Sequence, residues 1–305
     1  MSTLVSKNLG NILVTGGAGF IGSNLIKFII DNHKFNKIIS IDNYYTGSKK
    51  NHHKNKKVIY LKLDTRNILN NKNKILKNFN PKYVFHFAEF SRIVPSFKYI
   101  KDCWSFNTLG TFNVLLYVIK KKSKLIYSGS SSGLGKEINE HLSPYSWTKS
   151  KNIELIKNFS RWFNLDYTIV LFFNVYGQRQ IKNHYMSAVM GIFEDQYSKN
   201  KPLTVVKPGN QKRDFTHVDD IIKGTILAAI KGAKKEYQLG SGKNYKIIDV
   251  AKMFGTKIKY LKTRPGERFT GLSNYKLAKK DLGYFPKHNL KGYIKNFISK
   301  SKQKT

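Results

Sequence analysis

Short apolar runs alternate with longer amphipathic stretches through the first half of the chain. Apolar runs of this kind are typical of strands that are buried on both faces of a parallel sheet. Because helical patterns fall between them, the alternation favours an α/β fold built on a Rossmann-type, doubly wound parallel sheet. The predicted strands are 11–15, 37–41, 58–61, 83–87, 124–128 and 168–172, and two long helices are predicted at 100–121 and 146–163.

The rhythm becomes irregular after Asn174, where Gly and Pro punctuate the chain. A length of 305 residues suits one large domain or two small ones. We predict a Rossmann domain over 1–173 and a smaller mixed α/β substrate-binding lobe over 174–305, with segments near 213–240 returning to complete the sheet. Such a lobe would cover the carboxyl ends of the strands, where open α/β sheets bind ligands.

The first predicted strand runs into a glycine-rich turn and then into a helical pattern, as Gly16-Gly17-Ala18-Gly19-Phe20-Ile21-Gly22. Glycines let backbone N–H groups approach a pyrophosphate, and the start of a helix supplies partial positive charge. Asp42 ends the next apolar run, 20 residues beyond Gly22, where a carboxylate can accept hydrogen bonds from the adenosine ribose. Because an acid there repels a 2′-phosphate, the pattern predicts NAD rather than NADP.

Tyr145 and Lys149 stand four residues apart where the helix predicted over 146–163 begins, and on a helix two side chains at this spacing share one face. A tyrosine that acts as a base near pH 7 needs its pKa lowered by roughly 3 units, about 4 kcal/mol, and a nearby lysine cation can supply that. Ser130 lies in a Ser/Gly segment directly after a strand, where a small hydroxyl can bind a substrate oxygen. Each feature alone is also compatible with a solvated helix face or a flexible loop.

Taken together and in this order, these motifs resemble the extended short-chain dehydrogenase/reductase family over nearly the whole chain. Within that family the chain is similar to NAD-dependent UDP-sugar 4-epimerases of the UDP-galactose and UDP-N-acetylglucosamine type. The resemblance implies that Tyr145 takes the proton of the sugar 4-hydroxyl, that Ser130 steadies this oxygen, and that Lys149 holds the nicotinamide ribose. A transient 4-keto sugar would then turn over in the pocket while NAD stays tightly bound.

The resemblance also implies which residues contact each ligand. Asn174 lies in a segment whose Asn meets the nucleotide diphosphate, Arg213 and Arg264 resemble two phosphate-binding arginines, and Glu267 resembles the acid that holds the uridine ribose. The expected NAD contacts are Gly16, Gly19, Phe20, Ile21, Gly22, Asp42, Asn43, Asp64, Phe87, Ala88 and Lys149, and the expected substrate contacts are Arg92, Ser130, Tyr145, Asn174, Arg213, Arg264, Glu267 and Gly271.

Several positions bear on the substrate. Sugar-nucleotide 4,6-dehydratases of the family carry an Asp-Glu pair after the catalytic hydroxyl, where this chain has Ser131 and Ser132. UDP-glucuronate decarboxylases carry a Glu where this chain has Ser132. Those two activities, and a non-catalytic NAD-binding relative, are therefore the alternatives. Glu89 and Arg92 replace residues that are usually small in the epimerases, and they could form an internal salt bridge or read an unusual group such as a carboxylate.

Gly271 falls where the family's pocket-size residue lies, and a residue without a side chain would leave room for an N-acetyl group, although a turn glycine explains it equally well. In relatives, the helices that correspond to 100–121 and 146–163 pair across a two-fold axis into a four-helix bundle. The resemblance therefore implies a homodimer. The apolar residues of both helices permit such an interface and would equally suit an ordinary core face.

Composition limits the other partners. The formal net charge is +37, but only seven of the 55 basic residues are arginines and the lysines are scattered, so we expect no nucleic-acid partner. No apolar segment reaches the roughly 18 residues that span a bilayer, and no signal-peptide core precedes the glycine turn, so no membrane association is expected. A single cysteine, Cys103, suits a reducing cytoplasm. We expect no metal, because the spacing of the histidines does not match that of metal ligands; these are His52, His53, His141, His184 and His288.

Overall fold

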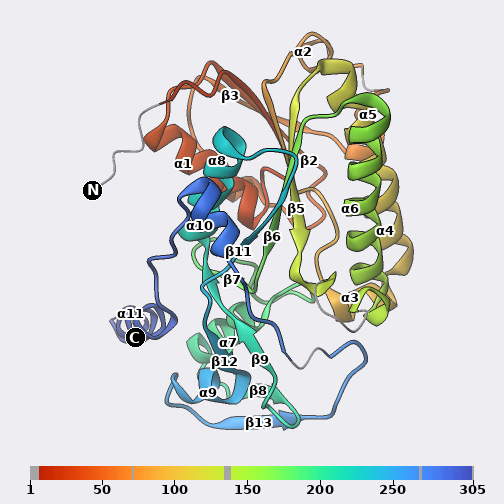
Figure 1. Cartoon of the computed structure of the whole chain (residues 1–305). Coiled ribbons are helices and arrows are strands. Elements are labelled where there is room, and N and C mark those ends of the chain that lie inside the picture. The colour runs from red at the N-terminus through yellow and green to blue at the C-terminus, as the bar shows by residue number, and fades with distance from the viewer. Residues whose placement is uncertain (1–6, 71, 134–138, 268–269, 304–305) are drawn as a thin grey trace.

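The computed structural model describes residues 7–70, 72–133, 139–267 and 270–303. Its central layer is a seven-stranded sheet with the strand order β11-β6-β5-β4-β1-β2-β3 (Figure 1). All neighbouring strands in it are parallel, which confirms the predicted doubly wound α/β fold. The strands are β1 Asn11–Thr15, β2 Lys37–Asp42, β3 Val58–Lys62, β4 Tyr83–His86, β5 Lys124–Ser130, β6 Tyr167–Phe172 and β11 Glu236–Leu239.

The six predicted strands all form, with ends within two residues of the prediction. The seventh strand, β11, comes from the second half of the chain and pairs with β6, so that Glu236 lies opposite Ile169. Apolar side chains of the central strands are buried on both faces, as the continuous runs of Ile and Val require.

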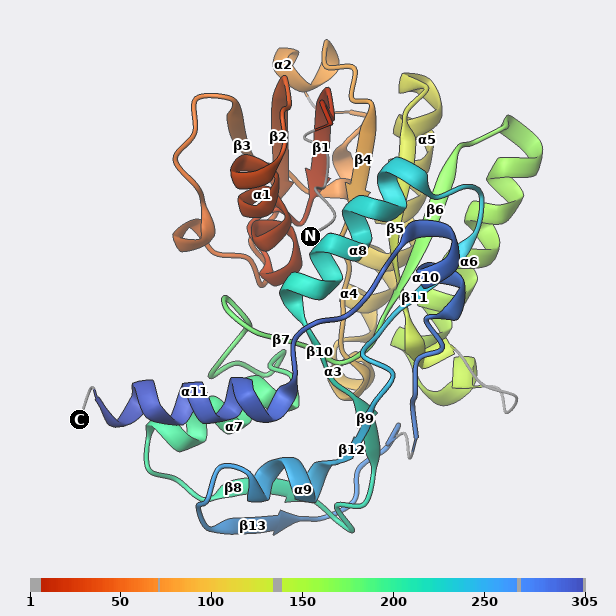
Figure 2. The same cartoon turned by 60° about the vertical axis from the view of Figure 1, so that its left-hand side comes forward.

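Helices cover both faces of the sheet, and the views in Figures 1 and 2 agree on their placement. One apolar core forms between the sheet and α1, α8 and α10, where Ile26 and Ile222 are buried. The other forms between the sheet and α5 and α6, where Val114 and Ile156 are buried. These helices are α1 Phe20–Asn32, α5 Thr111–Lys121, α6 Pro144–Phe163, α8 Val218–Lys231 and α10 Lys276–Leu282.

The helix predicted over 100–121 forms in three continuous pieces: α4 (Ile100–Trp104), a π-helical segment (Ser105–Gly110) and α5. The π-helical segment buries Asn107, whose Oδ1 accepts a hydrogen bond from the Phe90 N–H at 2.7 Å. The Asn107 amide also donates to Thr148 Oγ1 in α6 at 3.0 Å. One side chain therefore ties the loop after β4 to α6, both of which carry predicted site residues.

A smaller lobe lies below the sheet in Figure 2 and has its own apolar core, which includes Phe193 and Phe254. Next to this core, the buried carboxylate of Asp214 accepts hydrogen bonds from the backbone and hydroxyl groups of Ser241 and Ser273, which fixes the strand that carries Arg213. The elements of this part are β7 Val175–Tyr176, α7 Val189–Ser198, β8 Leu203–Val206, β9 Lys212–Asp214, β10 Thr216–His217, β12 Asn244–Lys246, α9 Ile247–Lys252, β13 Ile258–Leu261 and α11 Leu290–Lys302.

Two further short helices are α2 (Lys74–Lys77) and α3 (Ile93–Lys98). Among the described residues, no helix is both long enough and apolar enough to cross a bilayer.

The buried imidazole at the end of β4 predicts an acid-sensitive stability. His86 Nδ1 lies 2.7 Å from Thr15 Oγ1 and Nε2 lies 2.9 Å from Thr111 Oγ1, and burial lowers the pKa of His86 to about 4. In the unfolded chain the same imidazole has a pKa of about 6.5, so acid favours the unfolded state, which binds the proton more readily. The free energy of unfolding should therefore fall by up to about 3 kcal/mol as the pH drops from about 6.5 to about 4.

Urea denaturation at pH 7.0, 6.0 and 5.0 measures this effect. The pH slope should be smaller in His86→Asn, whereas His184→Asn, at an exposed position, should keep the slope of the unmodified protein. Equal slopes in all three proteins would show that His86 is not the group responsible.

Candidate functional site

A cavity of about 730 Å³ lies at the carboxyl ends of the strands and is also lined by residues of the smaller lobe. Nearly all of the predicted site residues line it, although they come from segments far apart in the sequence. Those that line it are Gly16, Gly19, Phe20, Ile21, Gly22, Asp42, Asn43, Phe87, Ala88, Arg92, Ser130, Tyr145, Lys149, Asn174, Arg213, Arg264 and Glu267.

Two predicted site residues, Asp64 and Gly271, are described but do not line the cavity. The Asp64 carboxylate accepts hydrogen bonds from Arg66 Nε at 2.9 Å and from Asn43 Nδ2 at 2.8 Å, so it positions a residue that does line the cavity. Gly271 is buried, and its carbonyl accepts from the Asp214 N–H at 3.1 Å. The roles assigned to these two residues stay predictions.

The glycine-rich turn between β1 and α1 is closely packed. Gly16 has φ of +71°, and a Cβ atom there would lie 2.9 Å from the Ala88 backbone nitrogen. A Cβ at Gly22 would lie 2.3 Å from the Gly16 carbonyl oxygen. Since the first N–H groups of a helix have no partner within it, and the first residues of α1 line the cavity, the turn offers the donors that a pyrophosphate requires.

Asp42 ends β2 and is held by backbone donors. Its Oδ2 accepts from the Ala18 N–H at 3.0 Å and its Oδ1 from the Tyr44 N–H at 2.8 Å. Burial raises the pKa of Asp42, and the two backbone hydrogen bonds oppose this effect. The turn and this carboxylate together fit the pyrophosphate and ribose of a dinucleotide.

Tyr145 lies in the first turn of α6, where Pro144 occupies the first helical position and Ser143 Oγ caps the helix by accepting from the Ser146 N–H at 3.1 Å. The Tyr145 side chain is 9% exposed and lines the cavity. Ser130 lines it as well, at the end of β5, with its Oγ 2.9 Å from Ser132 Oγ. The hydroxyl pair and the phenol therefore border one space.

Lys149 lies one turn further along α6 and is almost completely buried. Its Nζ donates to the Ser128 carbonyl at 2.6 Å and forms an ion pair with Glu89 Oε2. The other carboxylate oxygen of Glu89 accepts from Thr111 Oγ1 at 3.0 Å, Tyr127 OH at 3.0 Å and Asn152 Nδ2 at 2.8 Å. Glu89 is thus the partner of the predicted catalytic lysine, and no local pattern in the sequence indicates this contact.

The salt bridge considered between Glu89 and Arg92 does not form in the described part of the chain. Arg92 Nε donates to the Met186 carbonyl at 2.7 Å, and Nη1 donates to the Ser91 carbonyl at 2.7 Å. No carboxylate among the described residues pairs with Arg92. Burial lowers the pKa of Arg92, and Tyr145 is the ionisable neighbour that opposes this effect.

Arg213 and Arg264 share one acid. Arg213 Nη2 donates to Glu267 Oε1 at 2.9 Å, and Arg264 Nε donates to Glu267 Oε2 at 3.0 Å. One carboxylate between two guanidinium groups leaves positive charge at this end of the cavity, which suits a diphosphate.

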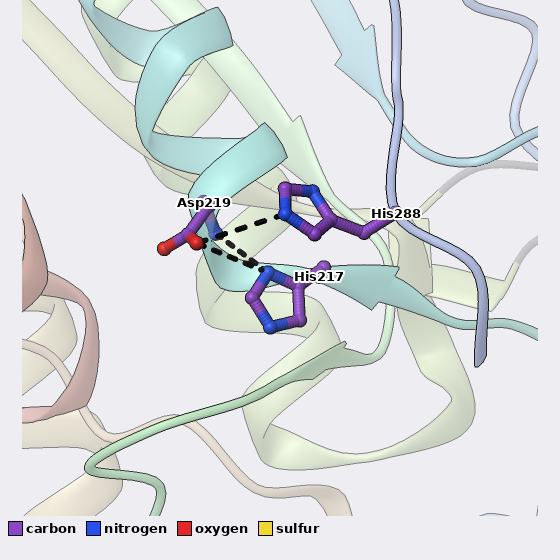
Figure 3. Close-up of side chains that lie close together, drawn as sticks. All are labelled: His217, Asp219 and His288. Atoms are coloured by element: carbon purple, nitrogen blue, oxygen red, sulfur yellow. Dashed lines mark hydrogen bonds and ion pairs between the residues drawn. The ribbon is translucent and has the colours of Figure 1, made fainter. Parts of the chain in front are cut away.

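A further cluster was not foreseen, because His288 lies about 70 positions from the other two members, His217 and Asp219. The side chains of His217, Asp219 and His288 lie close together, as Figure 3 shows. His217 Nδ1 and His288 Nε2 lie 3.6 and 3.8 Å from Asp219 Oδ2, so the three side chains could hold a metal ion. His217 Nδ1, however, already accepts from the Asp219 N–H at 3.2 Å, and the two imidazole rings stack 4.3 Å apart. Metal binding through Nδ1 would require His217 to give up its hydrogen bond with the Asp219 N–H.

The model of the NAD dependent epimerase/dehydratase family matches residues 12–240. A protein of Methanocaldococcus jannaschii named "Putative UDP-glucose 4-epimerase" is 30% identical, over 94% of this chain and 97% of that protein. UDP-glucuronic acid decarboxylase 6 of Arabidopsis thaliana is 26% identical, over 92% and 85%. The solved UDP-glucuronic acid 4-epimerase of Bacillus cereus, in complex with UDP-glucuronic acid and NAD, has a TM-score of 0.84 and 27% identity, over 97% of this chain and 100% of that one. Relatives that carry out different reactions are thus similar to a comparable degree.

The Glu89–Lys149 ion pair predicts strong energetic coupling. Glu89→Gln and Lys149→Met should each lower the free energy of unfolding by about 3–5 kcal/mol, because each leaves one buried group without its partner. The double variant should lose less than the sum of the two, with a coupling energy of at least about 1 kcal/mol. Urea denaturation of the four proteins gives this value.

The matched control is the exposed Lys27–Asp31 pair on α1, whose nitrogen and oxygen lie 2.7 Å apart. Its coupling energy should be about 0.5 kcal/mol or less. Similar coupling energies for the two pairs would contradict the role assigned to burial.

Proposed function

The chain belongs to the NAD-dependent epimerase/dehydratase family, and from this premise we propose that it is an NAD-dependent epimerase that inverts C4 of a UDP-hexose or UDP-N-acetylhexosamine through a transient 4-keto sugar. The observation that carries the proposal is that Tyr145, Lys149 and Ser130 border the same cavity as the glycine-rich turn and Asp42. Neither the three side chains alone nor the turn with Asp42 alone would distinguish an enzyme from a nucleotide-binding protein.

NAD⁺, when bound, supplies the hydride acceptor. The turn from Gly16 to Gly22 would hold its pyrophosphate, Asp42 its adenosine ribose and Lys149 its nicotinamide ribose. The charges of the cavity support a ligand with a diphosphate, because the described lining residues include five cationic side chains and only three carboxylates. The cations are Arg92, Lys98, Lys149, Arg213 and Arg264, and the acids are Asp42, Glu89 and Glu267.

In this proposal the protein moves one proton. The Tyr145 phenolate takes it from the sugar 4-hydroxyl and so becomes the phenol, which returns the proton after the 4-keto sugar has presented its other face. Ser130 Oγ holds the same oxygen. Arg213 and Arg264 tether the diphosphate, so that the sugar can turn without leaving.

A 4,6-dehydratase or a UDP-glucuronate decarboxylase is the alternative, and the similarity to a decarboxylase supports considering it. The loop after Ser130 disfavours both alternative activities, since this chain has Ser131 and Ser132 where the resemblance places the acidic residues of those enzymes. A non-catalytic role is disfavoured because both Tyr145 and Lys149 are present.

The test is incubation of the purified protein with UDP-glucose, UDP-N-acetylglucosamine and UDP-glucuronate, with products identified by NMR. We expect inversion at C4 without net NADH. Tyr145→Phe should lower turnover by about 10²–10⁴-fold with unchanged NAD content, because only the proton acceptor is lost.

Tyr176→Phe is the matched control, since it removes a buried hydroxyl that has no hydrogen-bond partner among the described residues and lies outside the cavity lining. This variant should leave turnover unchanged. A 4-keto-6-deoxy sugar or a pentose as product would assign the alternative instead, and full activity of Tyr145→Phe would remove Tyr145 from the mechanism.

We further propose that a second copy of the chain covers the outer face of α4, α5 and α6, as the four-helix bundle of relatives implies. Large apolar side chains there are about half exposed, and Trp162 is 61% exposed. Phe112, Trp162 and Phe163 gather around Phe159 across α5 and α6, with ring centroids 6.0, 5.9 and 5.3 Å from it. An apolar patch of this kind is typical of an interface. Its exposed members are Ile100, Trp104, Leu109, Phe112, Trp162 and Phe163.

Light scattering coupled to size-exclusion chromatography tests the interface. The unmodified protein should have twice the mass of the chain. Trp162→Glu should have the mass of one chain, because two-fold symmetry would bury one new carboxylate from each copy in the interface. Phe285→Glu, at a similarly exposed position outside this patch, should stay dimeric. A monomeric unmodified protein would refute the proposal.

A further inference from the structure

We propose that Arg92 recognises a carboxylate on the sugar of the substrate, so that the chain selects an acidic nucleotide sugar over a neutral one. This inference rests on the proposed function and names the substrate class of the same site. It starts from a cation that lines the cavity and has no acidic partner among the described residues.

The contacts of Arg92 fix its position but leave its charge uncompensated. Nε and Nη1 donate to the carbonyls of Met186 and Ser91, both at 2.7 Å. Carbonyl oxygens orient a guanidinium group without neutralising it, and a partly buried cation is stable only when an anion or solvent compensates it. The nearby acid that could have done so, Glu89, is held by Lys149 and three further donors.

The surroundings place Arg92 at the catalytic end of the cavity. It directly precedes α3, where Ser96 Oγ accepts from the Tyr145 N–H at 3.3 Å. Met186, whose carbonyl holds Arg92, packs in the same apolar cluster as Tyr145. A group bound by Arg92 therefore lies on the reacting sugar.

The diphosphate has other partners. Arg213 and Arg264 converge on Glu267 in the smaller lobe and form the cationic site suited to phosphates. A second anion, on the sugar itself, is what remains for Arg92. The planar guanidinium group of Arg92 matches the geometry of a carboxylate better than a lysine ammonium would. The carboxylate could be C6 of a uronic acid or part of an acidic substituent on the ring.

The experiment measures equilibrium binding by calorimetry to the NAD-loaded Tyr145→Phe protein, which holds ligands without turnover. The probes are UDP, UDP-glucose, UDP-glucuronate and UDP-N-acetylmuramate. We expect at least one of the two acidic sugars to bind more tightly than UDP-glucose, and which of them does so tells where the carboxylate sits. Adding Arg92→Gln should raise the Kd of that ligand about 10- to 100-fold and change those of UDP and UDP-glucose less than about threefold.

Two matched variants sharpen the result. Arg92→Lys keeps the charge and should restore part of the preference, and Lys98→Gln removes another cation of the same cavity and should leave the preference unchanged. Circular dichroism and NAD content confirm that each variant is folded.

Other outcomes overturn the inference. If UDP-glucose binds and is epimerised while neither acidic sugar is preferred, the proposed function stands and the role of Arg92 fails. If Arg92→Gln weakens all sugars equally and shifts the pH profile of turnover, Arg92 serves the Tyr145 phenolate instead. If no UDP-sugar binds at all, the proposed function itself fails.

Discussion

The buried ion pair between Glu89 and Lys149 is the interaction on which the geometry of the site depends. A carboxylate removed from water is unstable unless donors surround it, and here Lys149, Thr111, Tyr127 and Asn152 all point to Glu89. These donors come from α6, α5 and β5, while Glu89 follows β4. The pair therefore fixes α6 against the sheet, and with it the direction in which the first turn of α6 presents Tyr145.

The parts of the fold that could be predicted are those written in local patterns. Continuous Ile and Val runs predicted the parallel strands, and the close packing of Gly16 and Gly22 explains why that turn has glycines. Asp42 could be predicted because its distance from the turn is set by one β-α-β unit. Such patterns reveal which residues share a face or an edge of the sheet.

Patterns of this kind do not reveal partners across the chain. Glu89 and Lys149 are 60 residues apart, and Arg92 and Met186 are 94 residues apart. No periodicity or spacing in the sequence predicts either contact. Burial of Asn107 depended on a π-helical segment inside a helix that was correctly predicted as a whole. A charged pair close in sequence, Glu89 and Arg92, suggested a salt bridge, but the better donor set lay elsewhere in space.

How the cations of the cavity are paired matters more than the overall charge. A formal charge of +37 raises the rate of encounter with any anion at low salt, but it does not orient a ligand within the site. Orientation requires cations whose charge is still available. Lys149 is neutralised by Glu89, and Arg213 and Arg264 divide one acid between them, so positive charge remains at the diphosphate end, at Arg92 and at the solvent-exposed Lys98. A ligand with anions at both ends would be held in one direction, whereas a neutral sugar would leave the cation beside Tyr145 uncompensated.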